Sequence, residues 1–310
     1  MTVVGGGPIG CELSQALSRL GAEVTLVASR ILPNNEPEAG KLLLRVFENE
    51  GITVIPSRVD NVGPYLSTQN NGNNSSRSHS AVCSNGVIVT GELLLVAAGR
   101  RPVVRGIGLE EIGIKLNDAD GINVDDTLMT NIRDVYAAGD CTGDSQFTHY
   151  AGYQGAIAAR NILLPFTDPG VLGAGVISTT FTDPEVASVG MSEKVAKEKY
   201  GMNSVAVAMK EVNKTDRGIC DGVKEGIIKI VYRKKGYKIL GATIISPVAG
   251  ELIAEIATAM KTGLSFDMLA TVMHPYPSHS FTLQAMAAEV YYDKLVKSKR
   301  ILNVLKKIGL

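Results

Sequence analysis

Asp134-Val135-Tyr136-Ala137-Ala138-Gly139-Asp140 (residues 134–140) is the stretch around which the sequence is organised. Its apolar residues predict a short strand that ends at Gly139-Asp140, and a helix rich in small residues is expected to follow, with Thr148 near its start. Nucleotide sites often have this arrangement. The strand brings a carboxylate to a hydroxyl of the nucleotide, and the N–H groups of the next helix face the ligand. The stretch therefore predicts a nucleotide site at Asp140, and a turn without a ligand is the alternative.

A glycine turn precedes this stretch, near the N-terminus. Gly5, Gly7 and Gly10 have the spacing G-x-G-x-x-G between a β-prone segment and a helical pattern. The first glycine allows a tight turn, the second lets a pyrophosphate approach the backbone, and the third lets the helix pack on the strand. The turn predicts a dinucleotide site with contacts from Gly5, Gly7, Pro8, Ile9 and Gly10.

The end of the next predicted strand distinguishes between the two nicotinamide cofactors. NAD sites usually place an acidic residue there, to accept hydrogen bonds from the ribose. This strand instead ends in Ser29 and Arg30, which suit a 2′-phosphate, so NADPH is favoured over NAD. The alternative for Arg30 is a solvated loop cation. Glu12 lies in the first helical turn, where its simplest role is to compensate the helix dipole.

The remaining N-terminal half continues the alternation of strands and helices. Residues 36–50 predict an amphipathic helix and residues 52–55 a strand, which completes a βαβαβ unit. Residues 59–89 predict a β-ribbon with a polar centre, in which we expect His79 to be solvated. A buried parallel strand is expected next, and it ends before Gly99, where a nucleotide could approach the backbone.

The C-terminal half has a different character. Antiparallel strands are predicted at residues 186–189, 205–209, 226–232 and 239–245, with helices at 192–200 and 251–262, as in an α+β module. The loop His274-Pro275-Tyr276-Pro277-Ser278-His279-Ser280 is made rigid by two prolines, and rigid loops often present functional side chains. In the tail, residues 294–310 mix basic and apolar residues. We expect a terminal helix with a solvated face rather than a membrane-binding segment.

Composition excludes several classes of partner. The net charge is +0, which gives no indication of a nucleic-acid surface, and no apolar run is long enough for a membrane span. Cys11, Cys83, Cys141 and Cys220 form neither a CxxC nor a CxxxxC pair, so we predict no zinc knuckle, no bound metal and no local dithiol. Unpaired cysteines favour a reducing compartment, cytoplasmic or organellar.

Several of these motifs occur in one order that is similar to a known family. GGGPIGCE, the VAAGRRP turn, TNIRDVYAAGDC, FTDPEVASVG and the HPYPS loop resemble those of the pyridine nucleotide-disulfide oxidoreductases. These are flavoproteins related to dihydrolipoyl dehydrogenase and mercuric reductase, and the resemblance covers almost the whole chain.

The resemblance implies a fold, cofactors and a partner. We expect a Rossmann-like α/β NAD(P)-binding domain at residues 1–98, the C-terminal part of an FAD-binding domain at 99–168, and an α+β dimerisation domain at 169–310 that forms a homodimer. By the same likeness, the NAD(P) positions are Gly5, Gly7, Gly10, Glu12 and Gly99, and the FAD positions are Asp140 and Thr148. The expected reaction passes a hydride from NADPH (or NAD(P)H) to FAD and then electrons to a disulfide or another small-molecule acceptor.

Two departures from the family pattern qualify this expectation. Family members begin with an FAD-binding half that carries its own glycine turn and a redox-active CxxxxC, so the chain resembles the C-terminal part of such an enzyme. The dihydrolipoyl dehydrogenase branch also has HxHP followed by a glutamate, whereas this chain has Tyr276 and Phe281 at the matching positions. Tyr276 resembles mercuric reductase, but the paired C-terminal cysteines of that enzyme are absent.

Two functions remain open at the level of sequence. In the first, the chain is an oxidoreductase in which Tyr276 acts at the acceptor side, with His274 and His279 as possible helpers. Because an ordinary phenol has a pKa of about 10, Tyr276 would be a poor base at neutral pH. In the second, the chain is a truncated module that binds NADPH and dimerises without turnover. The colour of the purified protein distinguishes the two.

Overall fold

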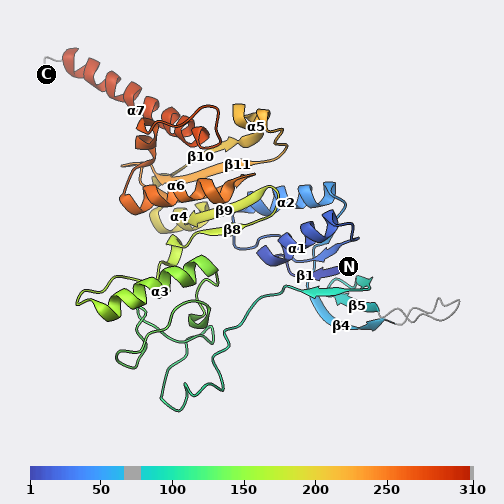
Figure 1. The fold of residues 1–310 in the computed structure, drawn as a ribbon. Helices are drawn as coiled ribbons and strands as arrows, with labels where there is room; N and C mark the ends of the chain where they lie inside the picture. Colours follow the sequence, from blue (N-terminus) through green and yellow to red (C-terminus); the bar gives the residue numbers. More distant parts are fainter. Residues whose placement is uncertain (66–77, 308–310) are drawn as a thin grey trace. The chain divides into compact units, whose positions relative to one another are not determined.

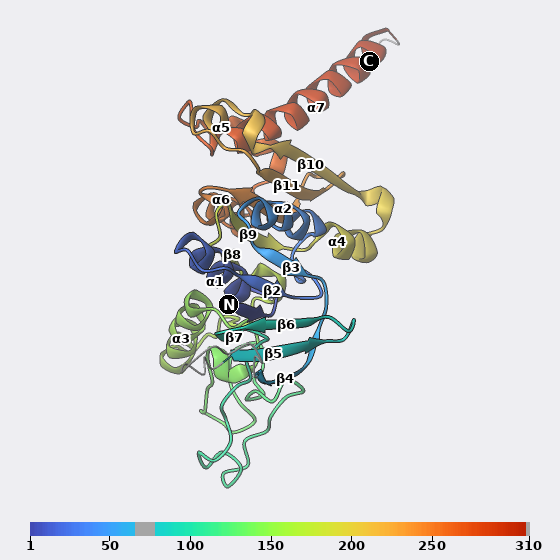
Figure 2. The same ribbon diagram turned by 90° about the vertical axis from the view of Figure 1, so that its right-hand side faces the viewer.

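The computed structural model describes residues 1–65 and 78–307. Its contacts divide the chain into two compact units, one formed by Met1–Ala98 with Thr179–Leu310 and the other by Gly99–Ser178. Figures 1 and 2 show the elements of each unit from two directions. Most of the predicted polar centre of the β-ribbon lies outside the described residues.

A parallel sheet forms the N-terminal part of the first unit. Its strands are β1 (Thr2–Val4), β2 (Thr25–Val27), β3 (Thr53–Ile55) and β7 (Leu94–Val96), in the order β3-β2-β1-β7 with parallel pairing throughout. Helices α1 (Pro8–Arg19) and α2 (Pro37–Asn49) connect the first three strands. This is the βαβαβ unit that the sequence predicts, and it confirms the α/β fold class.

A three-stranded antiparallel ribbon is inserted before β7. It contains β4 (Val59–Tyr65), β5 (Ser78–Cys83) and β6 (Ile88–Gly91), in that order. His79 lies on β5, and the prediction that it is solvated is wrong because its side chain is turned inward and the residue is only 9% exposed. Burial lowers the pKa of His79, since the charged ring would lose its hydration.

A second, five-stranded sheet forms the C-terminal part of the same unit. Its strands are β8 (Ser178–Thr180), β9 (Glu185–Gly190), β10 (Val205–Glu211), β11 (Ile227–Arg233) and β12 (Ile239–Ser246), in the order β10-β11-β12-β9-β8. Its helices are α4 (Glu193–Tyr200), α5 (Asp216–Cys220), α6 (Ala249–Thr262) and α7 (Phe281–Lys307). Helix α6 packs on β9 and β12, and every residue of β12 is buried. The α+β character predicted for this half is confirmed.

The two sheets of this unit share one hydrophobic core. Val186 on β9 and Ile245 on β12 belong to the same buried cluster as Val3 and Leu26 of the parallel sheet. All four side chains are completely excluded from solvent. Apolar burial of this kind is the main stabilising term in folding, so the two sheets support each other.

A buried charge network joins the same two segments. Lys229 on β11 is 3% exposed and forms ion pairs with Glu36 at 3.2 Å, Glu38 at 2.8 Å and Glu193 at 2.8 Å. Burial alone would lower the pKa of Lys229, but the carboxylates outweigh that effect and raise it. The lysine is therefore held charged between the start of α2 and the start of α4.

The second unit has little regular structure. Helix α3 (Thr148–Leu163) is its long element, and Asp140–Thr142 form a short 3-10 turn. A small core of Val104, Ile114, Ile122 and Ala137 holds the loops together. The prediction of a strand that ends at Gly139-Asp140 is wrong. Within the described residues of this stretch, the backbone pairs as in a sheet at only one point, the bridge between Met129 and Tyr136. No neighbouring strand continues the ladder.

The predicted C-terminal tail is helical, because residues 294–307 form the last part of α7. In Figure 1 its C-terminal part extends beyond the sheet of its own unit. None of the helices within the described residues is both long and apolar enough to cross a membrane.

Candidate functional site

The glycine turn between β1 and α1 is built by close backbone packing. Gly5 has a φ of +116°, which favours glycine, and a Cβ there would collide with the Ala97 carbonyl. A Cβ on Gly10 would collide with the Gly5 carbonyl oxygen. The turn therefore needs glycine at both positions for its own shape.

Gly7 differs from its neighbours because its outer face is open. A Cβ at this position would meet nothing within 4 Å. Gly7 is also the N-cap of α1, and Pro8 follows it in the first turn. Because glycine has no side chain, no side chain at this position caps the helix. The first backbone N–H groups of a helix have no partner within it, so a phosphate placed beside Gly7 could accept from them.

The Ser29-Arg30 loop lies directly beside this turn. A Cβ on Gly6 would collide with the Arg30 carbonyl oxygen, and the Leu32 N–H donates to the Gly6 carbonyl at 2.7 Å. The side chains of Ser29 and Arg30 are exposed, and neither has a hydrogen-bond partner among the described residues. The guanidinium is thus free to meet a ligand seated on the turn.

Glu12 already has a partner in the protein. Its Oε1 accepts a hydrogen bond from the Phe181 N–H at 2.8 Å, and the neighbouring Gln15 exchanges hydrogen bonds with the backbone of Asp183. The predicted cofactor role of Glu12 stays a prediction. In the structure, its carboxylate anchors α1 to the segment that precedes β9.

The Asp140 region belongs to the second unit. Gly139 has a φ of +81°, and its N–H donates to Gln154 Oε1 at 2.7 Å, which fixes the turn on α3. Asp140 and Thr148 are both exposed. Gly99, also in this unit, has a φ of +125° and open space where a Cβ would stand. The predicted FAD positions therefore have exposed side chains beside a fixed turn.

A buried polar atom beside this turn is poorly hydrogen-bonded. Gln154 is 1% exposed, and its Nε2 forms no hydrogen bond of normal geometry within the described residues, although it lies near enough to the Tyr150 hydroxyl to favour the phenolate there. The residue lines a hollow of about 190 Å³ together with Asn117, Val124, Thr142, Gly143, Asp144 and Val171. A buried donor that lacks a good partner is costly, so a hydrogen-bond acceptor placed there would be favoured.

The HPYPS loop presents Tyr276 in the first unit. The residue is 64% exposed, and its hydroxyl donates to Asp216 Oδ2 at 2.8 Å. The hydrogen bond to Asp216 raises the pKa of Tyr276 above its ordinary value, and the carboxylate would also repel a phenolate beside it. Tyr276 is therefore held in its neutral form.

His274 is held by two acceptors. Its Nδ1 lies 2.8 Å from the Val272 carbonyl and its Nε2 lies 2.7 Å from Glu255 Oε1. The side chain is only 6% exposed. His274 thus anchors the loop to α6, and its predicted catalytic role stays a prediction.

His279 lies at the other end of the same loop. Its Nε2 is 3.0 Å from Asp221 Oδ2, and that carboxylate also accepts from Arg217 Nε at 2.7 Å. Arg217 and then His279 lower the pKa of Asp221, since both stabilise its charged form.

Three residues beside these sites were not identified from the sequence. Asp216 and Glu255 meet the loop from other elements, and Gln154 meets the Gly139 turn from α3. The contact between Asp216 and Tyr276 joins residues 60 positions apart, so no local sequence pattern predicts it. Thr215, which caps α5, is the nearest sequence signal to Asp216.

Comparison with known families matches both halves of the chain. Residues 1–155 match the family described as pyridine nucleotide-disulphide oxidoreductase, and residues 176–287 match its dimerisation domain. A dihydrolipoyl dehydrogenase of Thermus scotoductus is 34% identical over 96% of this chain and 62% of its own length. A mercuric reductase of Bacillus cereus is 32% identical over 89% of this chain and 43% of its own length. The chain thus spans about half the length of these curated relatives.

Solved structures show the same fold. LpdA from Mycobacterium tuberculosis superposes with a TM-score of 0.82 at 29% identity, over 93% of this chain and 61% of its own. The flavoprotein disulfide reductase RclA from Escherichia coli gives a TM-score of 0.81 at 24% identity, over 93% of this chain and 63% of its own, which supports the fold alone.

Proposed function

The chain belongs to the pyridine nucleotide-disulphide oxidoreductase family, and from that premise we propose that it takes part in electron transfer from NADPH through FAD to a disulfide or small-molecule acceptor. The observation that carries the proposal is the glycine turn. Gly5 and Gly10 are closed by their own backbone neighbours, while Gly7 is open. A pyrophosphate fits only where the backbone can be approached, and that place is Gly7 at the start of α1.

The choice of NADPH rests on the loop beside the turn. Ser29 and Arg30 are exposed, and the backbone of Arg30 packs against Gly6. A guanidinium there would form charge-assisted hydrogen bonds to a 2′-phosphate, which NADH lacks. The loop carries no acidic residue to accept from the ribose hydroxyls of NAD.

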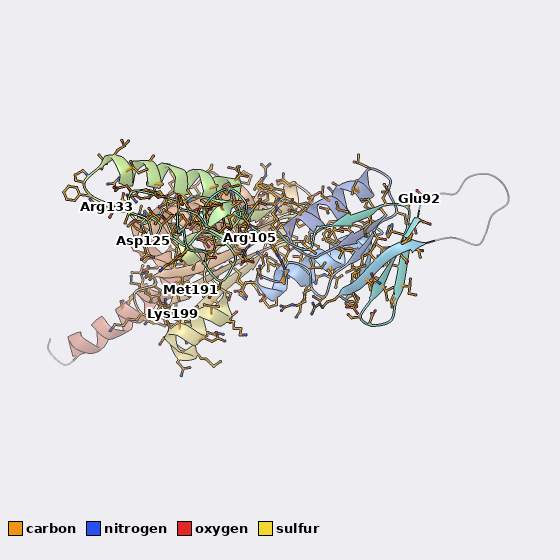
Figure 3. All side chains as sticks on the ribbon, turned by 90° about the horizontal axis from the view of Figure 1, so that it is seen from below. Glu92, Arg105, Asp125, Arg133, Met191 and Lys199 are labelled. Atoms are coloured by element: carbon orange, nitrogen blue, oxygen red, sulfur yellow. The ribbon has the colours of Figure 1, made fainter. Side chains whose placement is uncertain are left out.

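We expect Arg30→Ala to raise the dissociation constant for NADPH by about 10- to 100-fold, because charge-assisted hydrogen bonds are lost. The constant for NADH should change little. Isothermal titration calorimetry with both nucleotides measures the two values. Arg133→Ala, which removes an exposed arginine from a loop of the other unit labelled in Figure 3, is the matched control. An equal change for NADPH and NADH in Arg30→Ala would refute the 2′-phosphate contact.

The flavin side of the proposal uses the Gly139 turn. Asp140 is exposed beside it, and α3 begins at Thr148. The Gly139 turn is fixed by Gln154, which leaves the Asp140 carboxylate exposed where it could accept from the hydroxyls of a ligand. When bound, FAD would supply the redox chemistry, and the role of Asp140 would be to hold its hydroxyls.

The acceptor side of the proposal uses Tyr276. With its pKa raised by Asp216, the phenol keeps its proton at neutral pH. Tyr276 is therefore suited to orient an acceptor by hydrogen bonding rather than to remove a proton from it. The match of residues 176–287 to the dimerisation domain supports a homodimer through this half.

The absorbance spectrum of the protein as isolated tests the redox role. A flavin spectrum, together with NADPH oxidation in the presence of a disulfide, would support it. A colourless protein whose melting temperature rises with NADPH would instead support the second function, nucleotide binding without turnover.

A further inference from the structure

The loop that carries Arg30 is short and closely packed. It follows β2 and ends at Asn35, just before α2. Ile31 and Leu32 belong to the hydrophobic core of the first unit, and Leu32 is 2% exposed. The Leu32 N–H donates to the Gly6 carbonyl at 2.7 Å, so the loop is bonded to the glycine turn. The place of Arg30 beside that turn therefore depends on how firmly Leu32 is held.

Leu32 has a backbone conformation that leucine rarely adopts. Its φ is +44°, in the left-handed region that favours glycine. Strained residues of this kind persist only where the surrounding structure fixes them. Burial of the side chain is one constraint, and a turn closed by the Asn35 N–H on the Leu32 carbonyl at 3.0 Å is another. The loop therefore needs support at Asn35, because loosening this turn would let Leu32 relax.

That support comes from the C-terminal sheet. Asn35 Nδ2 donates to Ser188 Oγ on β9 at 3.0 Å, across 153 positions of the sequence. Ser188 Oγ lies 3.2 Å from Thr243 Oγ1, and the two residues face each other in the pairing of β9 with β12. Because Thr243 is 5% exposed and both residues lie in paired strands, the Ser188 hydroxyl is itself held in place.

The residue after Asn35 is anchored to the same sheet by other contacts. Glu36 Oε2 lies 3.2 Å from Lys229 Nζ on β11, and Glu36 Oε1 accepts from the Glu193 N–H. These contacts do not involve Asn35, so they would hold the start of α2 in a variant that lacks its side chain. The support of the loop can therefore be removed without breaking the buried charge network.

We propose that Asn35 is a positioning residue for cofactor choice, because its bond to Ser188 on the C-terminal sheet fixes the loop against the glycine turn and so presents Arg30 to a 2′-phosphate. An arginine that is already ordered loses less conformational entropy when it binds. The C-terminal half of the chain would thus take part in selecting the nucleotide without touching it. The inference rests on the proposed function in that Arg30 must select NADPH.

The first experiment measures binding of NADPH and NADH by isothermal titration calorimetry. We expect Asn35→Ala and Ser188→Ala each to raise the dissociation constant for NADPH about threefold to tenfold, as the cost of ordering one long side chain allows, and to leave that for NADH unchanged. Ser188→Thr, which keeps the hydroxyl, should bind NADPH as the unaltered protein does. Asn34→Ala, at the exposed neighbour of Asn35, is the matched control. An unchanged ratio of the two constants, with or without a lower melting temperature, would show a structural role alone and overturn the proposal.

A double variant shows whether Asn35 acts through Arg30. In an Arg30→Ala background, the further change Asn35→Ala should have no effect on NADPH binding, since no guanidinium remains to be positioned. Residues that act through each other are expected to be non-additive in this way. Additive losses from the two changes would mean that Asn35 acts by another route, and would overturn the proposal.

The second experiment needs no nucleotide. Amide hydrogen exchange, followed by NMR of protein made with isotope-labelled leucine, reports on the bond from the Leu32 N–H to the Gly6 carbonyl. We expect this amide to exchange about fivefold faster in Asn35→Ala and Ser188→Ala, because the loop opens locally more often. Asn34→Ala should leave the rate as it is. An unchanged rate in Asn35→Ala would show that its side chain does not fix the loop.

The two readouts separate this inference from the proposed function. If Arg30→Ala weakens NADPH and NADH equally, the proposed choice of NADPH fails, and exchange of the Leu32 amide still decides whether Asn35 holds the loop. If Arg30→Ala is selective for NADPH and Asn35→Ala is not, only the role of Asn35 fails.

Discussion

The two units of this protein differ in how their backbone N–H and C=O groups are hydrogen-bonded and in how their interiors are packed. In the first, paired strands form continuous ladders, and the two sheets share a core and a buried ion network. In the second, side chains of Asn117, Asp125, Asn131 and Asn161 hydrogen-bond to backbone groups of neighbouring loops. Figure 3 labels Asp125 among these loops. Buried backbone groups must be paired, and asparagine and aspartate do this where no ladder exists.

This difference teaches where each unit is vulnerable. A unit held by packing and a buried charge should respond strongly to changes in volume or charge balance. A unit held by single side chains near the surface should respond to the loss of one such side chain only locally, since water can replace the lost bonds.

The largest loss in the free energy of unfolding is expected from Lys229→Met. Removal of the lysine leaves Glu36, which is 5% exposed, without its positive partner, and breaking a buried pair costs about 3–5 kcal/mol. Urea denaturation measures the free energy of unfolding. Lys235→Met, an exposed lysine between β11 and β12, should be close to neutral. A small effect of Lys229→Met would show that the network is not a major support of the first unit.

The same network predicts how that variant responds to acid. Lys197 and then Lys229 lower the pKa of Glu193, so the folded state binds its proton less readily than the unfolded chain. The stabilisation is complete above the ordinary pKa of 4.5 and is lost as the pH falls below it. Lys229→Met should therefore lose less stability on acidification than the unaltered protein does.

A smaller loss is expected from Gly10→Ala. The new methyl group would meet the Gly5 carbonyl, and overpacking of this kind costs about 1–3 kcal/mol. Gly7→Ala is the matched change, because its methyl group would point into open space. We expect Gly7→Ala to keep the melting temperature and to weaken NADPH binding. Comparable melting temperatures for the two variants would contradict this account of the turn.

The smallest loss is expected from Asn161→Ala in the second unit. Asn161 bonds to the carbonyls of Thr127 and Asp168 and to the Asp168 N–H. Asn161 is 5% exposed, but its partners Thr127 and Asp168 are only half-buried, so water can reach them and we expect a loss of about 1 kcal/mol. Faster hydrogen exchange confined to residues 99–178 is the readout, and Asn123→Ala is the exposed control. Faster exchange throughout the first unit would remove the contrast between the two units.

Local patterns made much of this fold predictable. The glycine spacing predicted the β1–α1 turn, because Gly5 has a positive φ and packs against Ala97, and Gly10 packs directly on Gly5. The strand before Asp140 was predicted wrongly, since its apolar residues indicate burial and only a partner strand can make a ladder. His79 was predicted as solvated from its polar neighbours in sequence, but the alternation of β5 turns it inward. The Tyr276–Asp216 bond was not predictable, because it joins a loop to α5 across 60 positions of the sequence.

The shared core also has a consequence for synthesis. Val3 and Leu26 are translated well before Val186 and Ile245, with which they are buried. At ordinary elongation rates the interval is on the order of 10 s. Throughout that time the nascent parallel sheet has an incompletely covered apolar face, so a chaperone that binds such surfaces would meet this chain while it is still attached to the ribosome.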